Sequence, residues 1–275
     1  MTATAASSTR GRRPAGYEQD QRCPPVLLAA LGTVRDPELD EPITSLGFVA
    51  ACTLSADGAA EVRLRLPTYF CAPNFAYLMV ADAYDAVSAL PGVSSARVVL
   101  EDHFAAEAIN GGVAAHQGFA QSFDGEAVGE LHELRRDFLR KAVLAGTDQV
   151  CRALQASGTS ADAKTASTTE LTTMTLGQVP PSRALVRLRE RRAELGLPAG
   201  NEAPLLIDPV SGEPVTDDNV PLHLRRARVT AISLTANASI CSGMLRHRYD
   251  NAGQGEARAA EPTPRTTTSE REENP

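Results

Sequence analysis

Tryptophan is absent from this 275-residue chain, and aromatic residues of all kinds make up only 4% of it. Side chains on which nucleic acid bases stack are therefore scarce, and a formal net charge of −7 argues against a general polyanion binder. No apolar run approaches the ~18 residues of a membrane span, and residues 1–21 lack the apolar core of a signal peptide. We therefore expect a cytoplasmic protein that binds neither nucleic acid nor membranes.

Familiar enzyme signatures are also missing. The sequence has no G-x-x-x-x-G-K-[ST] phosphate loop, no G-x-G-x-x-G fingerprint and no G-x-S-x-G elbow. Its five cysteines are odd in number, widely scattered and contain no C-x-x-C pair. This pattern predicts free thiols in a reducing compartment rather than a disulfide framework. It also argues against a permanently bound metal, because an enclosed zinc ion or iron–sulfur cluster normally takes four protein ligands.

The composition changes along the chain and divides it into segments. The two ends are polar and lack periodicity, and a Ser/Thr/Ala-rich stretch separates two parts that contain apolar periodicity. We expect a disordered tail at 1–24, a first domain at 25–110, a helical extension at 111–156, a linker at 157–175, a small Arg-rich unit at 176–250, and a disordered tail at 251–275.

The first domain is predicted to be α/β (α+β) with two layers. A short apolar segment suggests an opening helix, and Asp57-Gly58 is a strong hairpin signal between two alternating segments. Pro73 suits a first helical position, and Pro91-Gly92 ends that helix. The predicted order is α-β-β-α-β, with strands at 48–54, 60–66 and 96–100 and a long helix at 73–90.

The rest of the chain is predicted to be a helical extension followed by a second small α+β unit. Helical spacing runs through 124–156, an Arg-rich helix is expected from Arg183 to Leu195, and a strand is expected at 227–234. Residues 176–250 hold ten Arg and no Lys against eight Asp and Glu. The preferred interpretation is a solvated helix face. The alternative is a docking surface for an acidic partner, formed by Arg183, Arg187 and Arg191.

Cys71 is the most informative single residue, because it lies where a strand gives way to a helix in the run RLPTYFCAP (residues 65–73). A thiol just before a helix start faces free backbone N–H groups and the positive end of the helix dipole, which favour the thiolate. The alternative, a small buried core cysteine, fits the position equally well.

The surrounding sequence resembles a known family. Residues 34–49 read VRDPELDEPITSLGFV, and residues 90–100 read LPGVSSARVVL. These motifs, with a strand ending in Thr and Cys and then a helix, are similar to the metal–sulfur cluster assembly domain. Its members include a eukaryotic cytosolic iron–sulfur targeting factor and a bacterial maturation protein of the phenylacetate oxygenase system. Pro67 stands where the family usually has Thr, and Thr68 and Pro73 are each one residue late.

The resemblance implies that Cys71 accepts or passes on metal, with Asp36, Glu38 and Thr68 in support. Carboxylates in the acidic turn would hold Cys71 in one protonation state or touch iron, and Thr68 would bond to the thiolate. Structural alternatives exist for each, since Asp before Pro caps a turn and Thr caps a helix. No cofactor would be permanently bound. A transient iron or iron–sulfur cargo would take its other ligands from a client metalloenzyme, another assembly protein, a second subunit of a homodimer or a small thiol.

Weaker candidates follow the third strand and lie late in the chain. Glu101, Asp102 and His103 combine carboxylates and imidazole, which suit iron or zinc, although a polar loop is the preferred interpretation. His103 with Cys71 would make a thiol–imidazole pair, but nothing in the spacing supports it. Cys241 is interpreted as a core or surface cysteine, with a second reactive thiol as the alternative.

Three functions are therefore compared. The leading hypothesis is an accessory factor, not an enzyme, that delivers iron or iron–sulfur units to a client, with a multicomponent monooxygenase suggested by the bacterial family members. The second is a metal-free adaptor that docks an acidic partner through its Arg-rich unit. The third is a cysteine-dependent enzyme with His103 as base. The sequence identifies neither the client nor the oligomeric state.

Overall fold

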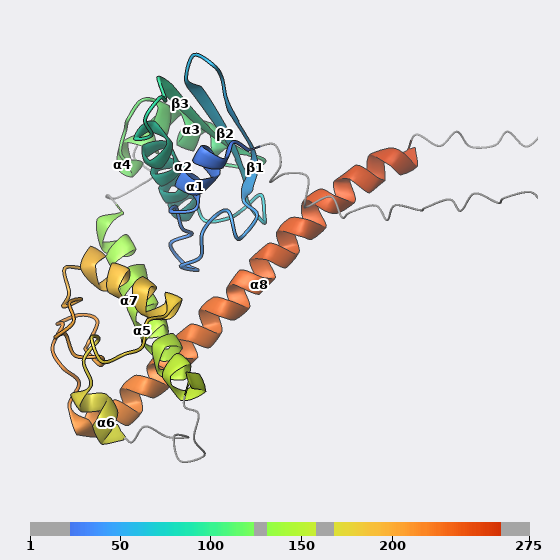
Figure 1. The fold of residues 1–275 in the computed structure, drawn as a ribbon. Coiled ribbons are helices and arrows are strands. Elements are labelled where there is room, and N and C mark those ends of the chain that lie inside the picture. Colours follow the sequence, from blue (N-terminus) through green and yellow to red (C-terminus); the bar gives the residue numbers. More distant parts are fainter. Residues whose placement is uncertain (1–22, 124–130, 158–167, 260–275) are drawn as a thin grey trace, which may run out of the picture.

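The computed structural model describes residues 23–123, 131–157 and 168–259. Most of the tails predicted at 1–24 and 251–275, and parts of the predicted helical extension and linker, lie outside these ranges, whereas residues 251–259 of the second predicted tail are helical. Figure 1 shows a sheet-containing unit, a helical unit and one long helix that runs past both. None of the helices in the described residues is long and apolar enough to cross a membrane.

The first unit is built on a three-stranded sheet. Its elements are α1 (Pro25–Leu31), β1 (Val49–Leu54), β2 (Ala59–Arg65), α2 (Pro73–Ser88) and β3 (Ser95–Glu101). The strands are ordered β1-β2-β3, with β1 antiparallel and β3 parallel to β2. The α-β-β-α-β order and the α+β class predicted from the sequence are thereby confirmed.

The sheet and α2 share one core because their apolar residues repeat at the right periods. Val62 and Leu64 are fully buried while Arg63 between them is exposed, as a strand with one covered face requires. In α2, Met79, Ala83 and Val87 recur every four residues and are buried. This packing fixes the end of β2 and the start of α2, which are the two elements that flank Cys71.

The C-terminal part is helical. After α3 (Ala106–Ala114) and α4 (Phe119–Ser122) come α5 (His132–Ser157), α6 (Thr168–Thr173), α7 (Arg183–Glu194) and α8 (Val220–Ala259), with a 3-10 turn at Asp217–Asn219. The fully buried members of its separate core include Val150, Leu176, Leu188, Leu205 and Val220. The Arg-rich helix is where the sequence predicts it, and Ser182 caps it by accepting a hydrogen bond from the backbone of Leu185.

One predicted element is wrong. The strand expected at 227–234 does not form, because these residues belong to α8. Ala227 and Ala231 are both buried, four residues apart, as one face of a helix requires, and α8 packs there against α5. Helix–helix packing therefore overrides the β-branched composition of this segment.

In the described part of 168–259 the extended pairings are isolated bridges rather than strands. The short helix α6 also lies inside the stretch predicted as a linker.

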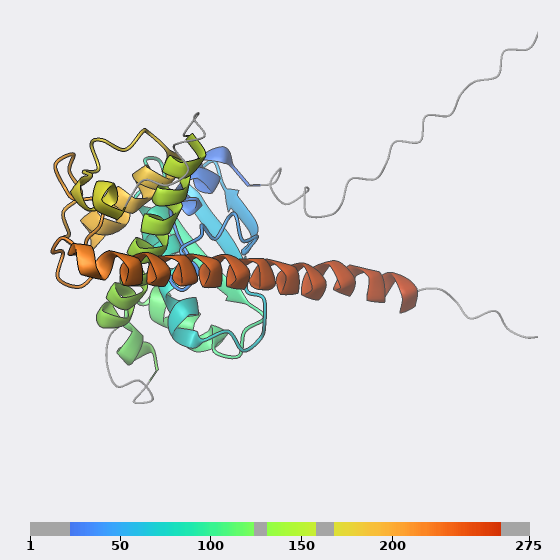
Figure 2. The same cartoon turned by 90° about the horizontal axis from the view of Figure 1, so that it is seen from below.

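The long helix α8 connects the two units. Its first half packs on α5, whereas Leu245 is part of the core of the sheet-containing unit. Figures 1 and 2 show α8 as one continuous rod passing both units. At Gly47, which has a φ of +79°, the nearest atom to an added Cβ would be Leu245 Cδ2 at 3.3 Å. A side chain at Gly47 would therefore meet both backbone strain and the helix.

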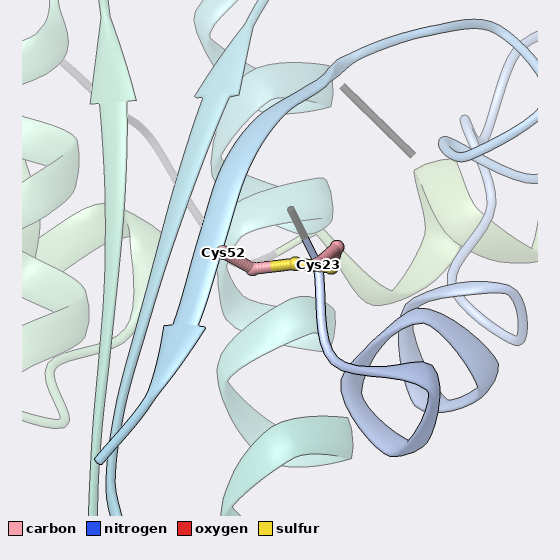
Figure 3. Close-up of a disulfide and its surroundings, with 2 residues drawn as sticks. All are labelled: Cys23 and Cys52. Carbon is pink, nitrogen blue, oxygen red and sulfur yellow. A yellow bond between two sulfur atoms is a disulfide. The ribbon is translucent and has the colours of Figure 1, made fainter. Parts of the chain in front are cut away.

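A disulfide joins Cys23 to Cys52 (Figure 3). Cys23 precedes α1 and Cys52 lies in β1 opposite Val62, and both residues are buried. The prediction that all five cysteines are free thiols is therefore wrong for this pair. The sequence offers no signal for it, because the two cysteines meet only when β1 packs beside the segment that leads into α1. Cys71, Cys151 and Cys241 are free.

Candidate functional site

Cys71 lies in the connection between β2 and α2, as the sequence predicts, and its side chain is partly exposed. The hydroxyl of Thr68 lies 3.3 Å from the sulfur. Ala72 occupies the N-cap of α2 and gives no side-chain cap. Thr68 therefore contacts the thiol of Cys71 and does not cap α2.

His103, which follows β3, contacts the backbone of the same loop. Its Nε2 lies 2.7 Å from the carbonyl oxygen of Cys71, and the backbone N–H of Ala105 donates to Nδ1 at 3.2 Å. These contacts fit a neutral imidazole that donates through Nε2. Burial, the largest cause, lowers the pKa of His103 and favours that form. Because both nitrogens are engaged with backbone, His103 positions the loop and is not arranged as a base for the thiol.

The acidic turn carries Asp36 as its organising residue. Its Oδ1 accepts hydrogen bonds from the backbone N–H groups of Glu38 and Leu39, both at 2.9 Å. Asp36 therefore closes the turn, as the structural alternative for this residue predicts. Burial raises the pKa of the Asp36 carboxyl from 3.8 to about 6, against the lowering effect of those two hydrogen bonds. Glu38 is half-buried beside it.

The helix α8 brings a second thiol into this region. Cys241 packs against the same core as Cys71, although the two are far apart in sequence. Burial, the largest cause, raises the pKa of Cys241, and interactions with the acidic groups of Asp36, Cys71 and Glu38 add to the effect. Sequence reasoning did not place Cys241 at this site. The signal that was available is the spacing of Ala238, Cys241 and Leu245, which marks one face of a helix.

The weaker ligand candidates are directed elsewhere. Glu101 forms ion pairs with Arg63 at 3.1 Å and Arg65 at 2.8 Å, so its carboxylate belongs to a charge cluster on the sheet. The backbone carbonyl of Asp102 accepts a hydrogen bond from Arg248 at 2.8 Å. Within the described ranges, no group of three or more His, Cys, Asp or Glu residues could hold a metal ion.

Of the three arginines proposed for partner binding, two form ion pairs within the chain and one is exposed. Arg187 pairs with Asp40 and Glu41, and Arg191 Nε lies 2.5 Å from Asp40 Oδ1 with almost no exposure of its side chain. These two side chains therefore bind the acidic turn of their own chain. Arg183 is exposed at the start of α7, so its role in binding a separate partner stays a prediction.

An exposed aromatic cluster lies beside Cys71 and was not identified from the sequence. Tyr69, Phe70 and Phe104 are 47%, 75% and 49% exposed, and their ring centroids are 5.0 to 6.3 Å apart. The backbone N–H of Phe104 donates to the carbonyl of Tyr69, which holds the two segments together. Large exposed apolar residues gathered in this way mark a surface that contacts another molecule.

The first unit is thus a small α+β domain that presents one partly exposed thiol between a strand and a helix. Residues 26–99 match the family model of an iron–sulfur cluster assembly protein. This match confirms that the segment resembles the iron–sulfur assembly family, and it supports a role in iron–sulfur cluster assembly. Assembly factors are accessory proteins, which favours an accessory over a catalytic role. Neither a curated protein nor a solved structure matches the chain.

Proposed function

We propose that this protein is an accessory factor that accepts an iron or iron–sulfur unit at Cys71 and passes it to a client metalloenzyme. The observation that carries the proposal is Cys71, a partly exposed residue whose sulfur lies 3.3 Å from the Thr68 hydroxyl, within the segment that matches the assembly family. A hydroxyl at that distance would donate to a thiolate and stabilise it. The identity of the client and the nature of the metal cargo are parts of this proposal.

The chemistry required is ligand exchange. The Cys71 thiol releases its proton to solvent when its sulfur bonds to the cargo metal. On delivery that bond breaks and a thiolate of the client forms a new one, with no transfer of electrons. A single protein thiolate suits this task, because a closed site with four protein ligands would retain the metal. The remaining ligands come from the client, a second subunit, another assembly protein or a small thiol.

Client recognition is assigned to the surface beside the thiol. The exposed cluster of Tyr69, Phe70 and Phe104 would provide apolar contacts next to the exchanging sulfur. Arg183, exposed on α7, would contribute charge toward an acidic client. The family resemblance suggests a multicomponent monooxygenase as that client, and a cytoplasmic location is part of the same proposal.

The test compares cysteine variants in maturation of the client. The client is first isolated by co-purification from the host, with iron and sulfide measured in what co-purifies. Cys71→Ser should still bind the client but leave it without iron and sulfide. Cys151→Ala is the matched control, because Cys151 is buried on α5 and burial raises the pKa of its thiol to about 11. If Cys71→Ser matures the client as well as the parent does, the carrier role is wrong.

A metal-free adaptor remains the second candidate, favoured by the exposed aromatic cluster and the charge on α7. It predicts that Cys71→Ser is fully active, whereas Phe70→Ala or Arg183→Glu weakens client binding. The same co-purification assay distinguishes the two functions. If the protein is a carrier, Cys71→Ser still binds the client but leaves it without iron. If the protein is an adaptor, the iron content of the client changes only in variants that also bind the client less well.

A further inference from the structure

The outer edge of β3 is covered at one end and open along the rest. Among the described strands β3 pairs with β2 alone, so its other side is an edge of the sheet. At Leu100 this edge is occupied by the side chain of Asn110 in α3, which accepts from the Leu100 N–H at 2.8 Å and donates to the Leu100 carbonyl at 3.0 Å. The amide of Asn110 thus takes the place that a further strand would have at this position.

The two earlier outward positions of β3 have no such partner. Successive residues of a strand direct their backbone groups to opposite sides, so Ala96 and Val98 face the same edge as Leu100. Within the described ranges, no side chain or further strand bonds to these outward N–H and carbonyl groups. Two donors and two acceptors are therefore left unpaired, which is the arrangement that an added strand completes.

A groove lies beside these unpaired groups. It has a volume of about 330 Å³ and is lined by β3, by α3 and by Tyr84 of α2. Val98, Val113 and Ala114 make its lining largely apolar. A peptide added to a sheet edge gains affinity from main-chain hydrogen bonds and specificity from pockets for its alternate side chains. The groove provides such a pocket next to the backbone groups that would bind the peptide.

The charge at this edge indicates what kind of peptide fits. Among the described residues that line the groove, Arg97 alone is charged, and its side chain is 70% exposed. Arg97 lies between Ala96 and Val98, and its contact with Glu61 is long, at 3.6 Å. A carboxylate on a docked peptide would therefore be attracted to this edge.

A second copy of this chain fits the edge poorly. The antiparallel pairing that uses Ala96 and Val98 of both copies would place the two Arg97 side chains directly opposite each other. Like charges in that position destabilise a sheet. Pairing cannot be extended through Leu100, because Asn110 already binds its backbone groups.

We propose that β3 binds an extended segment of a partner protein at Ala96 and Val98, with a carboxylate of that segment at Arg97 and an apolar side chain in the groove. The partner segment would add a strand to the edge of the sheet. Cys71 is not among the residues that line the groove, so this docking surface goes beyond the carrier role and does not depend on it.

The test selects peptides from a phage-displayed library of random heptapeptides on the full chain. The parent should enrich peptides in which Asp or Glu accompanies β-branched residues, because these suit an added strand at a cationic edge. Gly111→Leu should enrich none of them. Gly111 lines the groove, an added Cβ there meets nothing within 4 Å, and leucine suits a helix better than glycine. The variant therefore fills the groove and keeps α3.

Two further variants complete the selection. Gly243→Leu is the matched control, since a Cβ added at this glycine of α8 also meets nothing within 4 Å, and it should enrich the same peptides as the parent. Arg97→Glu should replace the acidic peptides by basic ones. Enrichment of the same acidic peptides by Gly111→Leu, or of none by the parent, would overturn the proposal. Cys71→Ser should bind the peptides as the parent does, so failure of the carrier role and failure of this proposal are distinguishable.

Amide hydrogen exchange then locates the bound peptide. With one enriched peptide at about ten times its dissociation constant, the amides of Ala96 and Val98 should exchange about tenfold more slowly, because only the free fraction leaves them unpaired. The amide of Leu100 is already bonded to Asn110 and should change little. Unchanged exchange at Ala96 and Val98 would refute the added strand. Sedimentation of the full chain without peptide tests the other occupant, since a dimer that Gly111→Leu dissociates would assign this edge to a second copy and refute the acidic partner.

Discussion

At the scale of single residues, Asp36 makes the stability of the protein depend on pH. Burial raises the pKa of its carboxyl to about 6 in the folded state, from 3.8. Between these values the unfolded chain has lost a proton that the folded chain still holds. The free energy of unfolding therefore falls as the pH rises through that window, and the loss is complete above about pH 6.

Asp36→Asn should remove this dependence. The amide oxygen can still accept from the backbone of Glu38 and Leu39, but no charge has to be buried. The stability of the variant relative to the parent should rise between pH 4 and pH 7 by about 2 kcal/mol, given ~1.4 kcal/mol for each unit of pKa. Urea unfolding at several pH values measures it, with Glu38→Gln as the half-buried control. A difference that does not vary with pH would contradict the prediction.

At the scale of elements, the sequence predicts the sheet-containing unit well and the rest less well. The alternation around Val62 and Leu64 and the proline at position 73 are local signals, and the elements they predict are present. The strand expected at 227–234 does not form, because Ala227 and Ala231 are buried where α8 packs against α5. That contact is tertiary, so the local sequence pattern does not predict it.

The candidate site follows the same rule. The loop of Cys71, the contact with Thr68 and the turn closed by Asp36 arise from residues close in sequence, so sequence reasoning found them. Cys241 reaches this region only because α8 crosses both units, and short-range patterns carry no information about that crossing. Arg187 and Arg191 of α7 likewise contact acidic groups of the turn at 40–41 of the same chain, which local sequence patterns do not reveal.

The contact between α7 and that turn should contribute strongly to stability. Arg191 is buried, and its guanidinium contacts Asp40 at 2.5 Å and Glu194 at 3.2 Å. Removing one member of a buried pair leaves the other charge poorly compensated, so Arg191→Met should cost about 3 kcal/mol. Arg183→Met changes an exposed arginine of the same helix and should cost less than about 0.5 kcal/mol. Chemical denaturation compares them, and equal midpoints for the two variants would refute the expectation.

At the scale of the whole molecule, two cores and one disulfide hold the chain together. The core around Leu27, Phe48 and Leu64 belongs to the sheet-containing unit, and the core around Leu188 and Leu205 belongs to the helical one. The helix α8 contributes Val220 to the second core and Leu245 to the first. Of the three free cysteines, Cys151 is buried, whereas Cys71 and Cys241 are partly exposed.

The disulfide gives the final prediction, which concerns the redox state of the chain. Alkylation of the denatured protein without reductant should label the three free cysteines, Cys71, Cys151 and Cys241, and prior reduction should raise the number to five. The bond spans a sequence separation of 29. Chain-entropy arguments therefore give a stability loss of about 3 to 4 kcal/mol when the bond is opened.

Replacing Cys23 and Cys52 together by Ser should lower the free energy of unfolding of the sheet-containing unit by about that amount. Adding reductant should destabilise the parent to the same extent and leave the double variant unaffected. Because reducing compartments keep thiols open, the thiol count of protein taken directly from its host reports which form operates there. Five labelled thiols before any reduction would contradict the bond and return the chain to the free-cysteine state that its scattered spacing predicts.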